Sequence, residues 1–377
     1  MEAKIVVGLG MGDEGKGITT DFLSKQSPGS CIVVRFSGGQ QAGHTVQIGD
    51  VKHTYATYGS GTGRGLPTYL SEYCTFYPPN ALNEHNVLID KGYKNLLYLH
   101  PLAKLTTYWD VAWGRLRERI YNHGSCGIGV GATMARQEQS PYKLFVCDLR
   151  YPRILEEKLR GIGRYYGEKV KDLNCSQEMV DYFYSQADNE KQRWDDAVGS
   201  TYTKTIVKGI MTYTDLTEYF AGYIFEGSQG ILLDMEHGIF PNVTYSSTTS
   251  KNAVKVCDEL GISDVEIYYV TRCYFTRHGA GWFPDFAPVL LSNNQDENNV
   301  WNEWQQNFRV AELDYELLKY AMMVDASYSR NYRKNMVITC MDQRKDSRFE
   351  TGYFPDISSF YTSWSPDSKD FKQVPYI

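Results

Sequence analysis

The chain has 377 residues, a net charge of −6 at neutral pH and a hydrophobic content of 42%. This composition is typical of a globular protein with a sizeable core, and the negative charge argues against broad binding to a nucleic-acid backbone. No run approaches the ~20 consecutive apolar residues of a membrane span, and no secretory leader pattern precedes the first strand. Eight cysteines without a C-x-x-C pair indicate free thiols in a reducing cytoplasm. Neither a nucleic acid nor a membrane is therefore expected as a partner.

The first glycine-rich loop lies near the start of the chain. An apolar, β-branched run before it predicts a buried strand, and the residues after it predict a helix. The segment Gly10–Lys16 matches the phosphate-loop pattern G-x-x-x-x-G-K, in which backbone N–H groups and a lysine bind phosphate. Gly17 stands where Ser or Thr would bind magnesium, so Asp13 is the candidate metal ligand.

A second glycine-rich loop, Ser37–Val46, follows the strand-like run Ser30–Phe36. Loops that follow neighbouring parallel strands meet at one edge of an open α/β sheet, where ligands bind in such folds. His44 has a glycine before it and a threonine after it, a setting unlike that of a packed core histidine. We therefore expect His44 to act as a proton donor.

The runs 12–17 and 38–45 together resemble the two N-terminal motifs of the adenylosuccinate synthetase family. That family joins L-aspartate to IMP, driven by GTP hydrolysis. The resemblance implies an α/β fold, with a large, mostly parallel twisted sheet flanked by helices and a P-loop-like GTP-binding loop. It also implies a single domain over residues 1–377, with a helical cap excursion at about 151–220. Gln41 replaces the family's asparagine, which contacts the purine nucleotide.

The middle of the chain predicts scaffold elements and a third glycine loop. We expect strands over 86–90 and 96–100 and a helix over 105–118. The run 124–133 then resembles the family's Thr-Thr-Gly-Arg-Gly-Ile-Gly-Pro loop, which binds the 5′-phosphate of IMP, with Ile128 at the arginine position. The polar segment that follows has helical periodicity and no evident chemistry.

A second purine-binding motif comes later in the chain. The run 223–234 resembles the family's Glu-Gly-Ala-Gln-Gly-x-Leu-Leu-Asp motif, whose glutamine contacts the purine, and a threonine further on corresponds to one that contacts phosphate. The resemblance thereby implies that the substrate nucleotide is bound by Asp13, Gln41, Ser125, Cys126, Gln229 and Thr244.

The run 276–284 resembles the family's Thr-Arg-Val-Gly-Ala-Gly-Pro-Phe-Pro motif, with His278 at the valine position. In the family an arginine-rich loop follows and binds the carboxylates of aspartate, but Arg309 is the only cation of that loop that this chain keeps. One arginine can still form a bidentate pair with a carboxylate. The resemblance therefore implies aspartate ligands at Arg309, Thr276 and Arg277.

The last motifs concern the nucleoside triphosphate. The strand predicted from 336 ends in a carboxylate at Asp342, which corresponds to the family's guanine-reading aspartate, and 364–368 is similar to its C-terminal Gly-Pro-Asp-Arg segment. Together with the first two loops, this resemblance implies Mg²⁺ at Asp13 and Gly43, and a homodimer. It implies GTP and phosphate ligands at Gly12, Glu14, Gly15, Lys16, Gly17, Gly43, Thr45, Asp342 and Pro366.

The implied reaction is a two-step ligation on a 6-oxopurine nucleotide. Asp13 accepts the N1 proton, O6 attacks the γ-phosphoryl group of GTP, and Lys16 and His44 assist as electrostatic stabiliser and general acid. The amino group of L-aspartate then displaces the 6-phosphoryl group. Three alternatives remain: use of dGMP or GMP, as in phage relatives that typically have serine at the Asp13 position; a catalytically idle purine-nucleotide-binding paralogue; and a P-loop nucleotide kinase. The sequence leaves the choice between ribose and deoxyribose, and between GTP and ATP, open.

Overall fold

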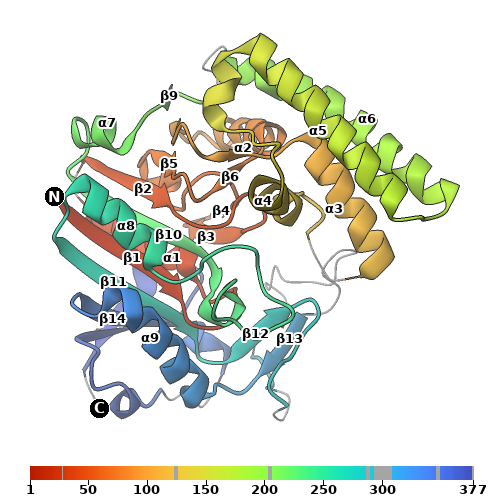
Figure 1. Ribbon diagram of the computed structural model, residues 1–377. Helices are drawn as coiled ribbons and strands as arrows, with labels where there is room; N and C mark the ends of the chain where they lie inside the picture. The colour runs from red at the N-terminus through yellow and green to blue at the C-terminus, as the bar shows by residue number, and fades with distance from the viewer. Residues whose placement is uncertain are drawn as a thin grey trace.

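The computed structural model describes residues 1–27, 29–122, 126–202, 206–285, 289–292, 308–344 and 349–375. Within these ranges, the largest element is a ten-stranded sheet (Figure 1). From one edge to the other its strands are β16 (Phe371–Val374), β15 (Ser359–Ser363), β14 (Arg333–Thr339), β11 (Asp264–Arg272), β1 (Glu2–Gly8), β10 (Gly222–Gly230), β2 (Cys31–Arg35), β5 (Thr68–Leu70), β7 (Leu97–Leu99) and β9 (Gly209–Ile210). Neighbouring strands are parallel except β15 and β16, which confirms the predicted mostly parallel sheet.

Helices flank the central strands on both faces. Side chains alternate between the faces of a strand, so Ile5 of β1 packs into the core on one face and Val6 into the core on the other. The first face is covered by α8 (Lys251–Leu260) and α9 (Tyr315–Ser329), and the second by α1 (Lys16–Gln26). A parallel sheet buried on both faces in this way presents its functional groups only at the ends of its strands.

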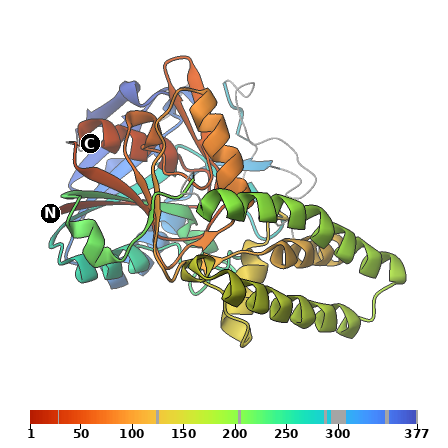
Figure 2. The same ribbon diagram turned by 90° about the horizontal axis from the view of Figure 1, so that it is seen from above.

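A second hydrophobic core lies beside the sheet, under a group of helices. Among them α3 packs against α5 and α6, and α2 packs against α6. Figure 2 shows α5 and α6 extending away from the sheet and joined at their outer ends. The bounds of these helices are α2 (Pro78–Asp90), α3 (Tyr108–Tyr121), α5 (Pro152–Asp172) and α6 (Gln177–Tyr202).

The strand predicted over 86–90 is wrong, because these residues form the last turns of α2. Two prolines at its first positions favour a helix start, and the buried residues of α2 recur at helical spacing. The apolar Val87 and Ile89, which suggested a strand, lie exposed on the outer face of the helix. The strand predicted over 96–100 is confirmed by β7. The helix predicted over 105–118 is confirmed by α3 from Tyr108 onward, whereas Leu105 belongs to a short strand and Thr107 is the N-cap of the helix.

Shorter elements complete the described part of the fold. No helix in the described ranges combines the length and apolarity needed to span a membrane. Three two-stranded sheets pair β3 (His44–Ile48) with β4 (Val51–Tyr55), β6 (Thr75–Phe76) with β8 (Lys104–Leu105), and β12 (Phe275–His278) with β13 (Phe308–Ala311). Two further α-helices in the described part of the chain are α4 (Val130–Gln139) and α7 (Tyr213–Thr217).

Candidate active site

A cavity of about 800 Å³ lies at the carboxyl-terminal edge of the sheet, where the loops after β1, β2, β10 and β11 meet. Most of the residues predicted from the sequence line it: Gly12, Asp13, Glu14, Gly15, Lys16, Gly17, Gln41, Gly43, His44, Thr45, Cys126, Gln229, Thr244 and Arg277. Thr276, Arg309, Asp342 and Pro366 do not line it, and Ser125 lies outside the described residues. The first three glycine loops of the sequence therefore converge on one site.

The first glycine loop is held from inside by the carboxylate of Glu14. This buried group accepts hydrogen bonds from the backbone N–H of Gly10 (3.0 Å) and of Gly12 (2.8 Å) and pairs with the ammonium group of Lys16. Because an unpaired buried carboxylate would be costly, these contacts fix the path of the loop. Glu14, which the sequence suggests as a GTP ligand, here stabilises the loop that carries Lys16.

The absence of Ser or Thr at position 17 has a steric cause. A Cβ on Gly17 would lie 2.8 Å from Cβ of His44 and 3.1 Å from Oγ of Ser60. The first turn of α1 therefore lies directly against His44, and only glycine allows this approach.

We predict that Gly17→Ser, which restores the usual phosphate-loop residue, lowers activity instead of raising it. Overpacking costs about 1–3 kcal/mol and would displace His44, so kcat should fall about tenfold. Phosphate release at saturating substrates measures kcat, and denaturant unfolding measures the lost stability. Gly17→Ala carries less bulk and should give a smaller effect, whereas an unchanged kcat in Gly17→Ser would contradict the steric argument.

Asp13 lies in the turn of the loop with φ of +60°, in the left-handed region. Arg272 donates a hydrogen bond to its backbone carbonyl, and Nε2 of His278 lies 3.0 Å from its carboxylate Oδ2. Burial alone would raise the pKa of this carboxyl. The hydrogen bond and charge of His278, followed by the charges of Arg272 and Lys16, hold the pKa below its ordinary value. Asp13 is therefore ionised at neutral pH, as a base or a metal ligand must be.

His44 is paired with a carboxylate that enters the site from β10. Nδ1 of His44 lies 2.6 Å from Oε1 of Glu226, which is fully buried. The other carboxylate oxygen accepts the backbone N–H of Ser60 at 3.0 Å, and the Ser60 hydroxyl donates to Oε1. Because Nδ1 is committed to Glu226, Nε2 is the ring nitrogen left for a ligand in the cavity.

The protonation of this pair depends on what enters the site. Burial lowers the pKa of the His44 imidazole, and Glu226 only partly offsets this effect. Burial would raise the pKa of Glu226, but the charge and hydrogen bond of His44, then Arg35 and Ser60, hold it below its ordinary value. A phosphoryl group beside Nε2 would add negative charge and favour the imidazolium form, which is the form a general acid requires.

The third glycine loop leads into the N-terminus of α4 at the cavity wall. Arg115 and Gln40 each donate to a backbone carbonyl of the loop at 3.1 Å. Gly129, the N-cap of α4, has φ of +80° and no space for a side chain, because a Cβ would lie 2.9 Å from a backbone nitrogen of α3. Burial raises the pKa of the Cys126 thiol to about 11, so it remains protonated. The hydrogen bonds from Arg115 and Gln40 hold this loop in place, and its backbone N–H groups could bind a phosphate.

Two glutamines flank the cavity near the first loop. Gln229 has φ of +57°, and its Oε1 would lie 3.2 Å from a Cβ on Gly12, so its amide lies against the first loop. The Gln41 amide is buried, and neither its oxygen nor its nitrogen has a hydrogen-bond partner among the described residues. A buried amide without partners costs free energy, so Gln41 is available to bind a ligand.

The three predicted aspartate ligands hold the backbone around β12. Arg277 donates to three backbone carbonyls at 2.8–3.1 Å, and Arg309, opposite it on β13, donates to two at 2.6 and 3.0 Å. Thr276 donates to the carbonyl of Gly12 at 3.2 Å. Burial, followed by the charge of Arg309, lowers the pKa of Arg277 to about 10. Within the described residues neither guanidinium is paired with a carboxylate, so both cations can attract an anionic ligand.

The predicted guanine-binding residues lie near the first loop but outside the cavity wall. Asp342 is exposed and follows β14, whose Thr339 donates to the carbonyl of Glu14 at 2.7 Å. Pro366 is exposed, and the next residue, Asp367, accepts the backbone N–H of Gly49 at 3.1 Å. Both segments are thus tied to the elements that surround the phosphate loop.

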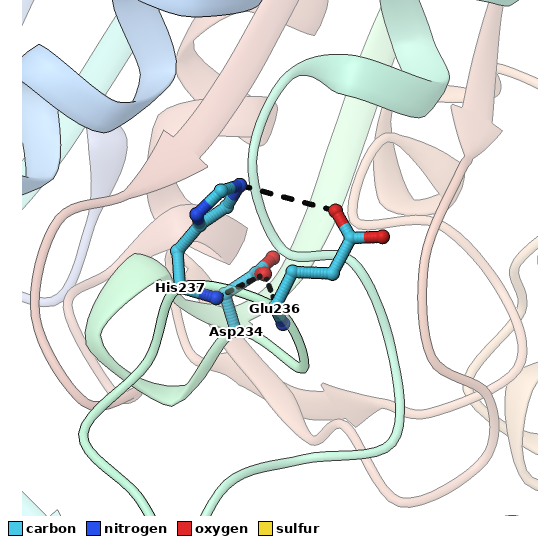
Figure 3. Close-up of side chains that lie close together, drawn as sticks. All are labelled: Asp234, Glu236 and His237. Carbon is cyan, nitrogen blue, oxygen red and sulfur yellow. Dashed lines mark hydrogen bonds and ion pairs between the residues drawn. The ribbon is translucent and has the colours of Figure 1, made fainter.

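One group of possible metal ligands lies beside the site. Figure 3 shows Asp234, Glu236 and His237 close together. Asp234 accepts the backbone N–H of the other two at 2.8 and 3.1 Å, while its second oxygen accepts the N–H of Thr248 at 2.6 Å. Glu236 is paired with Lys251 at 2.6 Å. The hydrogen bonds of Asp234 and the ion pair of Glu236 stabilise the loop that carries Thr244 to the cavity.

Four cavity or supporting residues were missed by the sequence reasoning. Two of them could have been found from the sequence: Glu226 is the first residue of a recognised motif, and His278 replaces the valine of another. The sequence did not indicate the other two, which are Arg272 at the end of β11 and Arg117 on α3. A cation after a strand or on a helix is usually a solvated surface group, although both of these line the cavity.

Comparison with known proteins identifies the family. A family model described as adenylosuccinate synthetase matches residues 5–346. The adenylosuccinate synthetase of Thermoplasma volcanium is 29% identical over 338 residues, which cover 85% of this chain and 72% of that protein. The enzyme of Xylella fastidiosa strain M12 is 30% identical over 298 residues, covering 75% of this chain and 65% of the relative, so the chain spans about two thirds of that relative's length.

Two solved structures share the fold. Succinoaminodeoxyadenylate synthetase of cyanophage S-2L, bound to dGMP and dATP, superposes with a TM-score of 0.65 at 15% identity, over 99% of this chain and 95% of that one. Fully ligated adenylosuccinate synthetase of Plasmodium falciparum gives a TM-score of 0.63 at 19% identity, over 99% and 87%. The chain therefore belongs to the adenylosuccinate synthetase family of GTP-dependent ligases, as its motifs predict.

Proposed function

We propose that this chain joins L-aspartate to C6 of IMP with hydrolysis of GTP, through a 6-phosphoryl intermediate, and releases adenylosuccinate. The observation that carries the proposal is the meeting, in one cavity, of an ionised Asp13, a Glu226-paired His44 and the loop of Lys16. Membership of the family supports the same reaction.

Each group has a distinct task in this reaction. Asp13 accepts the N1 proton of the purine, so that negative charge collects on O6. O6 attacks the γ-phosphoryl group, the bond to the bridging oxygen breaks and GDP leaves. Lys16 and the loop N–H groups stabilise the charge on the transferring oxygens, and His44 acts as general acid. The amino group of aspartate then displaces the 6-phosphoryl group, which leaves as inorganic phosphate. The cations of Arg277 and Arg309, which have no carboxylate partner among the described residues, favour a dianionic amino acid nearby.

The same cavity offers ligands for magnesium. The Asp13 carboxylate and the Gly43 carbonyl are hard oxygen donors on its wall, a donor set that fits Mg²⁺. Bound there, the ion would neutralise phosphate charge during transfer. The family's homodimer and a cytoplasmic location complete the proposal, and the eight free thiols are consistent with a reducing compartment.

A second candidate substrate is dGMP or GMP. The Gln41 amide has no hydrogen-bond partner among the described residues, and its side chain is longer than the asparagine of the family motif. It offers both a donor and an acceptor to a purine edge. A 2-amino group would give its oxygen a partner. The cyanophage protein of the same fold was solved with dGMP, which makes this substrate worth testing.

The deciding experiment is aspartate-dependent phosphate release with IMP, dIMP, GMP and dGMP in parallel, with GTP or ATP as donor and products weighed by mass spectrometry. We expect turnover with IMP and GTP and the mass of adenylosuccinate. Turnover with dGMP or GMP instead would select the second candidate. A nucleoside di- or triphosphate product would indicate a kinase, and tight nucleotide binding without phosphate release would indicate an idle paralogue.

A further inference from the structure

His278 touches the proposed catalytic base, although the reaction as written needs no histidine at this place. Its Nε2 lies 3.0 Å from Oδ2 of Asp13, and the two side chains are 15% and 26% exposed. The motif that 276–284 resembles has valine here, which could donate no hydrogen bond. The contact is thus a feature of this chain.

The histidine ring is held in place from its own side. His278 is the last residue of β12 and pairs with Phe308 of β13 in the antiparallel register. The two rings also contact each other, with centroids 4.9 Å apart and planes inclined by 42°. An imidazole fixed by a strand and by an aromatic neighbour can hold another group in position.

The backbone of Asp13 is held by the same part of the fold. Arg272, at the end of β11, donates to the carbonyl of Asp13, and Thr276 of β12 donates to the carbonyl of Gly12 at 3.2 Å. These two contacts fix the turn in its left-handed conformation, which a non-glycine residue adopts only when surroundings impose it. Rotation of the carboxylate itself is the freedom that remains, and His278 contacts that group.

We propose that His278 is a positioning residue for the base: its Nε2–H donates to Oδ2 of Asp13, which leaves Oδ1 to accept the N1 proton of the purine. This inference rests on the proposed function, because it assigns the free oxygen to a nucleotide. A base held within a few tenths of an ångström of its proton reacts faster than one that rotates, and misplacement by about 1 Å can cost 10²-fold. Bond formation here is a proton transfer only, from purine N1 to a carboxylate oxygen.

The test compares His278→Val with His278→Gln in the full-length protein. Valine restores the family's residue and removes the donor, so kcat should fall about tenfold or more while the KM for nucleotide changes less than about threefold. Glutamine places an amide N–H near the position of Nε2 and should recover most of kcat. His85→Val, on α2 outside the cavity, is the matched control and should keep wild-type kcat.

Equal kcat in His278→Val and wild type, or no recovery in His278→Gln, would overturn the proposal. A readout independent of turnover separates it from the proposed function: a double-mutant cycle of Asp13→Ala and His278→Val, each of which removes one partner of the contact, measured by denaturant unfolding. If the pair forms as described, the two changes are non-additive even when wild type proves inactive. Additive effects would overturn the contact itself, whatever reaction the chain catalyses.

Discussion

Asp13→Asn should lower kcat by about 10³-fold while the chain stays folded and binds its nucleotide with nearly unchanged affinity. Asparagine has the same size, and its side-chain oxygen can still accept the hydrogen bond from His278, so the loop geometry is kept. A neutral amide cannot take the N1 proton of the purine. The wild-type group is charged at neutral pH, because its neighbours hold the pKa of Asp13 below the ordinary value of a carboxyl, and it can accept this proton.

Phosphate release at saturating substrates gives kcat for this variant, and calorimetric titration with the nucleotide gives its affinity. Asp195→Asn, an exposed ion-pair partner on α6, is a matched control that should behave as wild type. If Asp13→Asn kept a kcat close to that of wild type, Asp13 would not be the catalytic base. Loss of nucleotide binding in proportion to kcat would instead assign it to binding alone.

The local part of the site is readable from the sequence. A strand, five glycines and a lysine in the first seventeen residues follow a pattern whose geometry is set by backbone sterics, so the phosphate loop is predictable without tertiary information. The setting of His44 among small polar neighbours also indicates chemistry. Lys16 and His44 both line the cavity.

The partners of these residues are not readable in the same way. Glu226 lies 182 positions from His44 in sequence, and only the neighbouring positions of β10 and β2 in the sheet bring them together. The wrong strand prediction over 86–90 has a similar cause. A short apolar run does not by itself distinguish a strand from a helix, and here the tertiary packing of the whole segment favours a helix. Arg309, predicted from its place in a motif, proves to bind loop carbonyls, a contact that no local pattern encodes.

Glu226→Gln is expected to lower kcat by about 10²–10³-fold with little change in the KM for nucleotide. The amide can still contact Nδ1 of His44 but brings no negative charge to support the imidazolium form. Burial already lowers the pKa of His44, so losing the charge of Glu226 lowers it further. A general acid is active below its pKa; the falling limb of the pH–rate profile at high pH should therefore move to lower pH in the variant.

The control is a second buried carboxylate–histidine pair elsewhere in the chain. Glu84 lies 3.6 Å from His53, outside the cavity, so Glu84→Gln changes a buried charge without touching His44. It should reduce stability and leave both kcat and the pH limb of the folded enzyme unchanged. A pH limb that stays in place in Glu226→Gln would show that His44 does not titrate in turnover. If Glu84→Gln moved the limb as far, the shift would reflect general loosening of the core and not the His44–Glu226 pair.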